Sequence, residues 1–278
     1  MKNILLTIEY DGTAFFGWQR QPGKRTVQGE LERVLSLLCG EAVTIAGTSR
    51  TDAGVHAYRQ QATLQGDFGI PIERIPIAAN NLLAGPGPYA VGDVRILDAV
   101  EMPADFHARF SSVGKKYIYR IYNSGEPKIM LRNYFYWVKH PLDLVSMKKA
   151  ASYLMGKHDF KSFMAAGGKE MKTTVRTIYK ADVVTAKMRE QELFPYPEKV
   201  ILFEITGDGF LYNMVRIIAG TLVEVGLGKI PPDAMMEIIQ GKERRRAGHT
   251  APPQGLYLAE IYYDKKDCFK EGERQNEN

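Results

Sequence analysis

The sequence predicts an α+β protein built on one extended sheet, with helices against one face. Two observations predict this class. Short segments rich in β-branched and aromatic residues alternate with longer segments of helical periodicity along the chain. The elements also fall into two halves of the same style, although no close sequence repeat relates them. We assign the first half to residues 1–105, the second half to residues 106–264, and a disordered polar tail to residues 265–278.

The first half begins with a β-forming run that stops at the turn Asp11-Gly12. Thr26 can cap the first helix, and Gly40 can end it. A polar loop at 48–57 separates two short strand patterns. The elements expected in order are a strand at 3–10, a helix at 27–39, strands at 43–47 and 58–65, a helix at 71–83 broken near Pro76, a turn at 85–88 and a strand at 89–98.

The second half repeats this style, and the helix around residue 217 is apolar on almost every side, which predicts burial. The segments 165–172 and 241–250 are expected to be mobile loops. The elements expected in order are strands at 115–123 and 134–138, a helix at 143–155 stopped by Gly156, strands at 173–185 and 199–206, helices at 210–225 and 232–240, and a last strand at 256–263.

Composition limits the function classes. The net charge of +5 and the pI of about 9.0 suit a polyanionic partner but do not establish one. The two cysteines form no disulfide framework, and no apolar run is long enough to span a membrane, so we expect a cytoplasmic protein. The scattered histidines predict no metal site, and the absence of a GxGxxG segment after a strand gives no support for a dinucleotide cofactor.

The loop GTSRTDAGVHA at 47–57 is the first candidate site. It surrounds Arg50 and Asp52 with small residues, which let a ligand approach the backbone closely. An aspartate in such a loop often only hydrogen-bonds its own turn. A carboxylate can instead act as a nucleophile that forms a covalent adduct with a sugar or a base.

Arg216 and the strand KKYIYR at 115–120 are two further candidates. A guanidinium on a buried helix needs an anionic partner, for which Glu204, Asp208 and Asp52 are available. Pairing with Asp52 would lower the pKa of that carboxyl, whereas another partner would make a structural ion pair. Tyr117 and Tyr119 share one face of their strand, where they either pack across the sheet or stack on a base.

Several motifs in order give the chain a resemblance to the tRNA pseudouridine synthase A family over roughly residues 3–263. They are YDGTAFFGWQRQ (10–21), SRTDAGVHA (49–57), FHARFSS (106–112), KKYIYRI (115–121), GKHDFKSF (156–163), VRTI (175–178), DGFLYNMVRIIAG (208–220) and APPQGLYL (251–258). The chain departs from the pattern at Ser49, where members often carry Gly before the arginine.

The resemblance implies the pseudouridine synthase fold, a mixed and mostly antiparallel sheet flanked by helices, in two related halves with a central cleft. It implies that Asp52 is the catalytic aspartate and that Tyr117 packs on the target uracil. Arg216 would pair with the aspartate, and Arg50 would help to turn the uridine out of its stack. The expected reaction converts uridines 38, 39 and 40 of the tRNA anticodon stem-loop to pseudouridine, in a homodimer without cofactor or metal.

Three alternatives stay open at this point. An active synthase could have shifted tRNA targets, because specificity depends on surface loops. A catalytically dead relative could act as a tRNA-binding chaperone, although the intact Asp52, Tyr117 and Arg216 argue against this. An unrelated basic RNA-binding module with tyrosine-bearing strands would give Asp52 and Arg216 no reason to meet.

Overall fold

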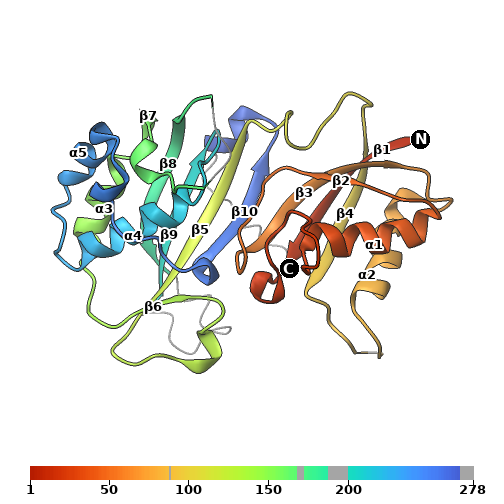
Figure 1. The fold of residues 1–278 in the computed structure, drawn as a ribbon, viewed down its shortest axis with the longest axis horizontal. Helices are drawn as coiled ribbons and strands as arrows, with labels where there is room; N and C mark the ends of the chain where they lie inside the picture. The colour runs from red at the N-terminus through yellow and green to blue at the C-terminus, as the bar shows by residue number, and fades with distance from the viewer. Residues whose placement is uncertain (88, 168–171, 187–199, 270–278) are drawn as a thin grey trace. The chain divides into compact units, whose positions relative to one another are not determined.

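The computed structural model describes residues 1–87, 89–167, 172–186 and 200–269, and the chain divides into two compact units (Figure 1). The first unit comprises residues 1–112 and 257–261. The second comprises residues 113–256 and those from 262 onward. Each unit combines α-helices with a layer of paired strands, which confirms the predicted α+β class.

The first unit orders its strands β4-β1-β3-β10, with β2 also paired to β3. Strand β1 is antiparallel to both β3 and β4, β2 is antiparallel to β3, and β10 is parallel to β3. The helices α1 and α2 pack together, and α2 lies along β4 (Figure 1). The bounds are β1 (Lys2–Tyr10), α1 (Val27–Cys39), β2 (Ile45–Gly47), β3 (His56–Gly66), α2 (Ile75–Leu83), β4 (Val94–Met102) and β10 (Leu256–Tyr262).

Helix α1 forms where its caps and apolar period predict it. The Thr26 side chain accepts a hydrogen bond from the Gly29 N–H, and Gly40 ends the helix with a φ of 78°. Leu31 and Leu35 lie one turn apart and are fully buried, so the apolar face of α1 forms part of the core of this unit.

The second unit orders its strands β5-β9-β8-β7, all antiparallel, with β6 parallel to β5. Helix α3 packs against α4, α5 and β8, and α4 is buried along most of its length, as its apolar sequence predicts (Figure 1). The bounds are β5 (Gly114–Asn123), β6 (Tyr136–Val138), α3 (Leu144–Ser152), β7 (Gly156–Asp159), β8 (Val175–Thr185), β9 (Val200–Gly207), α4 (Met214–Gly226) and α5 (Ala234–Gly241).

Among the local expectations one is wrong and one is confirmed, and one short strand was not expected. The strand expected at 89–98 is β4 at 94–102, because the chain first passes so close to α2 that a Cβ on Gly92 would lie 2.3 Å from the Leu83 carbonyl oxygen. The break expected near Pro76 is confirmed, since a 3-10 helix (Ile72–Arg74) ends just before α2 and Pro76 stands in the first turn of α2. The short strand β7 has almost no β-forming residues and was not expected.

Two segments expected to be mobile or disordered are held by contacts. In the 241–250 segment, the Arg244 guanidinium donates hydrogen bonds to the Ala247 and Gly248 carbonyls and to the Thr250 hydroxyl. In the tail, Lys265–Phe269 form a 3-10 helix with Cys268 buried. The remaining tail residues, 270–278, and residues 168–171 of the expected loop at 165–172 lie outside the described residues.

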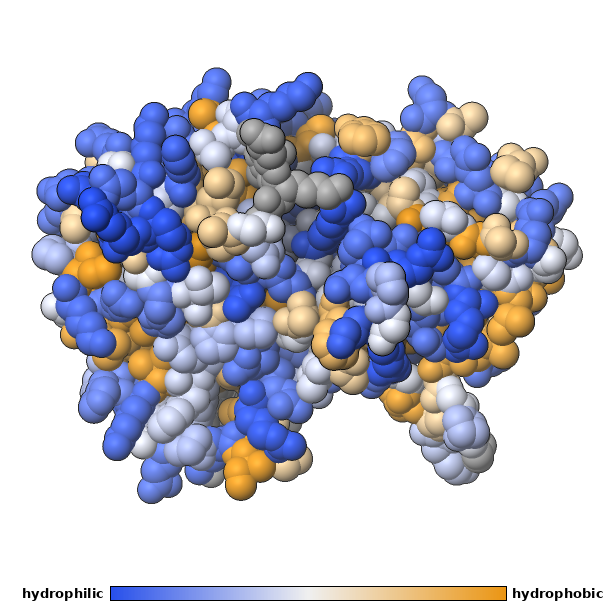
Figure 2. Space-filling model, in the orientation of Figure 1, coloured by the Kyte–Doolittle hydropathy of each residue, from blue (hydrophilic) through white to orange (hydrophobic). Residues whose placement is uncertain are grey.

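The visible surface is mostly hydrophilic, with hydrophobic residues scattered among polar ones (Figure 2). Among the residues that the structure describes, none of the helices has the length and hydropathy that a membrane span requires.

Candidate active site

The loop between β2 and β3 presents Arg50 and Asp52 on a defined backbone. The Val55 N–H donates a hydrogen bond of 3.2 Å to the Asp52 carbonyl, and Gly54 between them has a φ of 78°. A positive φ at the third residue of such a turn favours glycine. The Asp52 side chain is half-buried and Arg50 is exposed, so both can meet a ligand.

Neighbouring β3 fixes the first part of this loop. The Thr48 backbone N–H and hydroxyl both donate to the Gln61 carbonyl, at 2.8 and 2.9 Å. The fully buried Gln60 amide donates to the Ser49 carbonyl at 2.7 Å. Buried polar groups are stable only when they are hydrogen-bonded, so these bonds hold the backbone beside Arg50 in one conformation.

The segment that follows β1 fixes the residue before Asp52. The Trp18 N–H donates to the Thr51 carbonyl at 3.1 Å, and the Tyr10 and Thr51 hydroxyls share a buried hydrogen bond of 2.8 Å. The Trp18 indole lies so close to Gly47 that a Cβ there would come within 2.4 Å of the ring. Thr51 is thus held through its backbone and its side chain.

Two glycines let this segment approach the loop backbone. A Cβ on Gly12 would lie 2.0 Å from the Val55 carbonyl oxygen, and a Cβ on Gly17 would lie 2.6 Å from the Thr51 carbonyl oxygen. The Gly12 N–H also donates to Nδ1 of His56 at 3.1 Å. The sequence marks the segment 10–21 as a motif but does not indicate its role. The long-range backbone contacts show that this segment supports the loop that carries Asp52.

Tyr117 lies on β5 in the second unit and is 6% exposed. Its ring meets the edge of Phe210 with centroids 5.1 Å apart and planes at 84°. The Phe210 ring stands just before α4, which packs against β5. The Tyr117 ring is therefore buried and held at right angles to the Phe210 ring.

Arg216 lies in the first turn of α4 and is half-buried, rather than fully buried as the sequence predicts. Its Nε donates to the Ala251 carbonyl at 2.8 Å, and its Nη1 donates to Oδ1 of Asn213 at 2.8 Å. Asn213 adopts a φ of 58°, a left-handed conformation that asparagine tolerates better than most residues. These two acceptors orient the guanidinium.

One of the three carboxylates proposed as partners of Arg216 has another cation. Oε2 of Glu204 lies 2.7 Å from the Lys116 ammonium in an ion pair across β5 and β9.

Tyr119 lies on β5 and its pKa is raised well above the ordinary 10.0 by burial, while the Arg216 guanidinium offsets only part of this rise. The Tyr119 hydroxyl therefore stays protonated and donates to the Pro252 carbonyl at 2.7 Å.

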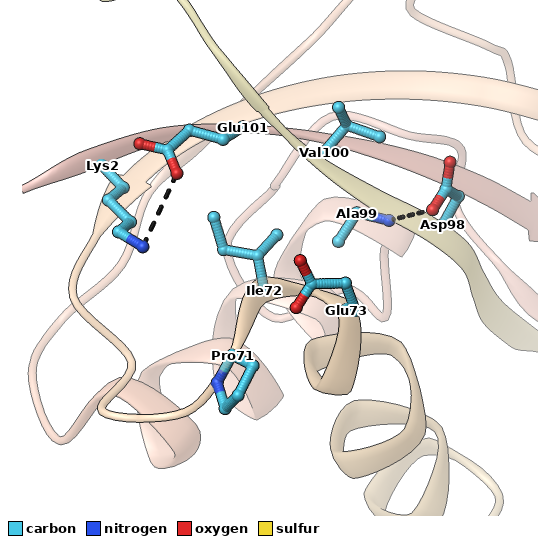
Figure 3. Close-up of a pocket in the computed structure, with 8 residues that line it drawn as sticks. All are labelled: Lys2, Pro71, Ile72, Glu73, Asp98, Ala99, Val100 and Glu101. Atoms are coloured by element: carbon cyan, nitrogen blue, oxygen red, sulfur yellow. Dashed lines mark hydrogen bonds and ion pairs between the residues drawn. The ribbon is translucent and has the colours of Figure 1, made fainter.

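A cavity of about 440 Å³ beside β4 contains none of the predicted site residues (Figure 3). Its charged side chains are Lys2, Glu73, Asp98 and Glu101, and the lysine pairs with Glu101 at 3.6 Å. The three carboxylates give this cavity a negative charge that would repel the phosphates of a nucleic acid.

In the described parts of the chain, no group of three or more His, Cys, Asp or Glu side chains could hold a metal ion.

Comparison with known proteins identifies the chain's relatives. A model of the tRNA pseudouridine synthase family matches residues 6–111 and 150–264. The chain is 48% identical to tRNA pseudouridine synthase A of Acetivibrio thermocellus and 46% identical to that of Caldicellulosiruptor bescii. It is 43% identical to tRNA pseudouridine synthase A 2 of Clostridium perfringens. Each comparison covers 95% of this chain and all of the relative.

Proposed function

The chain belongs to the tRNA pseudouridine synthase family, and we propose that it isomerises tRNA uridine through nucleophilic attack by Asp52. The reaction class is that of its relatives: an isomerase that converts uridine in tRNA to pseudouridine. The geometry of the 48–55 loop supports the role of Asp52. It combines a fixed backbone with a carboxylate that is only half-buried, so the nucleophile is positioned and still accessible.

In the proposed reaction, an Asp52 oxygen attacks either C6 of the uracil or C1′ of the ribose. The bond between N1 and C1′ breaks, the uracil turns, and C5 bonds to C1′. The bond between Asp52 and the substrate breaks and restores the free carboxylate, the proton leaves C5, and N1 gains a proton. The product is an isomer of the substrate, so the balance requires no oxidant, reductant or cofactor.

Tyr117, Arg216 and Arg50 have supporting roles in this proposal. Tyr117, which is buried against Phe210, packs on the target uracil. Arg216, already oriented by Ala251 and Asn213, pairs with the catalytic carboxylate. The exposed Arg50 fills the space that the extruded nucleotide leaves in the RNA.

Tritium release from tRNA labelled at C5 of uridine tests the nucleophile. We expect release by the wild type and by Asp67→Asn, which alters an exposed carboxylate in the same unit. We expect none by Asp52→Asn, with tRNA affinity within several-fold of wild type. Appreciable release by Asp52→Asn would refute the assignment.

The proposed targets are uridines 38, 39 and 40 of the anticodon stem-loop, acted on in the cytoplasm by a homodimer. The family resemblance supports each of these points. Transcripts that keep uridine at only one of the three positions test the targets, and conversion elsewhere in the tRNA would favour shifted specificity. A light-scattering mass of twice the 31.3 kDa chain would support the dimer, and a monomer mass would contradict it.

A further inference from the structure

The turn between β4 and β5 exposes an aromatic ring that the proposed chemistry does not use. Phe110 is 77% exposed, and hydrophobic burial would stabilise the fold if the ring packed inside. The His107 ring lies beside it, with centroids 4.4 Å apart. The Arg109 guanidinium carbon lies 5.8 Å from the centroid of the Phe110 ring. An exposed aromatic ring therefore lies close to both an imidazole and a cation.

Hydrogen bonds within the turn give it one conformation. The Ser111 N–H donates to the His107 carbonyl at 2.9 Å, and the Ser111 hydroxyl accepts from the His107 N–H at 3.1 Å. The Arg109 N–H donates to Nδ1 of His107 at 3.1 Å. The Ser112 hydroxyl donates to the Arg109 carbonyl at 2.9 Å. These hydrogen bonds thus fix the backbone on both sides of Phe110.

The turn is also anchored to the strands beneath it. The Asn3 amide on β1 donates to the Phe106 carbonyl at 2.9 Å. The fully buried Ala108 fixes the centre of the turn, and its N–H donates to the Thr63 hydroxyl on β3 at 3.4 Å. Because the turn is already ordered, a ligand that contacts Phe110 would bind with little loss of conformational entropy.

We propose that Phe110 is a stacking platform for an unpaired base of the tRNA, with Arg109 contacting a neighbouring phosphate. This inference rests on the tRNA substrate of the family. Unpaired bases stack on aromatic side chains, and guanidinium groups bind phosphate. The exposed Arg109 beside the exposed ring provides both contacts on one rigid turn. The site binds RNA outside the reacting uridine and takes no part in bond making.

Equilibrium binding of tRNA at fixed ionic strength tests the platform. Removing one base–aromatic stack weakens binding by about 5- to 150-fold, so we expect a loss in this range for Phe110→Ala. Phe110→Leu keeps an apolar side chain without a π-face and should lose nearly as much. Phe110→Trp should bind like wild type. Leu37→Ala is the matched control, because Leu37 is 65% exposed on α1 in the same unit.

Anticodon stem-loops with single abasic nucleotides identify the stacked base. One abasic position should weaken binding to wild type and leave binding to Phe110→Ala unchanged. Unaltered affinity of both the Ala and Leu variants, or additive losses at every abasic position, would overturn the proposal. A lower mass of the variants in solution, without an abasic effect, would overturn it as well and assign Phe110 to contact between copies of the chain.

Turnover separates this inference from the assignment of Asp52. At saturating tRNA, Phe110→Ala should release tritium at the wild-type rate, whereas Asp52→Asn should bind tRNA and release none. An inactive Asp52→Asn beside wild-type binding by Phe110→Ala would therefore reject only the platform. An active Asp52→Asn would reject only the nucleophile.

Discussion

Replacing Gly17 with alanine should displace the loop that carries Asp52. Gly17 has a φ of 83°, and an added Cβ would lie 2.6 Å from the Thr51 carbonyl oxygen and 3.1 Å from the Asp52 carbonyl carbon. The shortest ordinary van der Waals contact is 3.4 Å, so either backbone must move by about 0.8 Å, the difference between 3.4 and 2.6 Å. A misplacement of about 1 Å can slow catalysis about 100-fold. We expect kcat to fall by about 10- to 100-fold.

Gly23→Ala is the matched control for this change. Gly23 has a φ of 68°, and a Cβ added there would have no atom within 4 Å. Alanine at either site carries the left-handed backbone penalty of about 1–2 kcal/mol. Only Gly17→Ala also brings its Cβ against the loop that carries Asp52. Thermal unfolding should show a loss of stability in both variants, and the loss should be larger for Gly17→Ala.

Single-turnover tritium release at saturating tRNA separates displacement of the loop from general destabilisation. It should give a near-wild-type rate for Gly23→Ala and the reduced rate for Gly17→Ala, at a temperature where both variants are folded. Equal rates for the two variants would refute the reasoning. So would wild-type turnover by Gly17→Ala, because the contact at Thr51 would then have no effect on the nucleophile.

Two further changes test single hydroxyl and carboxyl groups. Tyr10→Phe removes the hydroxyl that shares a hydrogen bond with Thr51, and should lower kcat by up to about tenfold with little change in KM. Thr51→Ser keeps the bond and should retain activity. A wild-type kcat for Tyr10→Phe would contradict this role of the hydroxyl. The Ser146 hydroxyl donates to Asp143 at the start of α3 and lowers the pKa of the Asp143 carboxyl below the ordinary 3.8. The ionised carboxyl therefore stabilises the fold above pH 3.8, and this stabilisation is lost as pH falls through the lowered pKa. Asp143→Asn should therefore lower the unfolding temperature near neutral pH, and its difference from wild type should shrink below pH 3.8; a difference independent of pH would refute it.

Local signals in the sequence predicted the elements whose cause is itself local. Thr26 and Gly40 mark the ends of α1 because caps act within one turn of the helix. The shift of β4 depends instead on Gly92 passing the end of α2, a contact between segments that no local pattern records. Strand β7 likewise forms because β8 offers it a partner, in register from Gly156 to Asp159.

In the candidate site, too, some features follow from local sequence and others from long-range contacts. Asp52 and Arg50 could be selected from one loop, because a charged pair among small residues is visible in the sequence. The supports of that loop come from much earlier in the chain, at Tyr10 and Trp18, and their contacts use a hydroxyl and a backbone N–H. Since any residue except proline has a backbone N–H, side-chain identity could not predict the bond from Trp18.

The distribution of buried polar residues explains how this loop can be fixed and still leave Asp52 accessible. Thr48, Ser49 and Thr51 are buried, whereas Arg50 is exposed and Asp52 is half-buried. Burial of the three hydroxyl residues would destabilise the fold without partners, and the observed hydrogen bonds to the loop come from the strands and segments around it. The buried residues thus fix the backbone, whereas Arg50 and part of Asp52 stay accessible. Loss of a hydrogen bond at a buried hydroxyl should therefore affect turnover through the geometry of the loop, without any contact between that hydroxyl and the substrate.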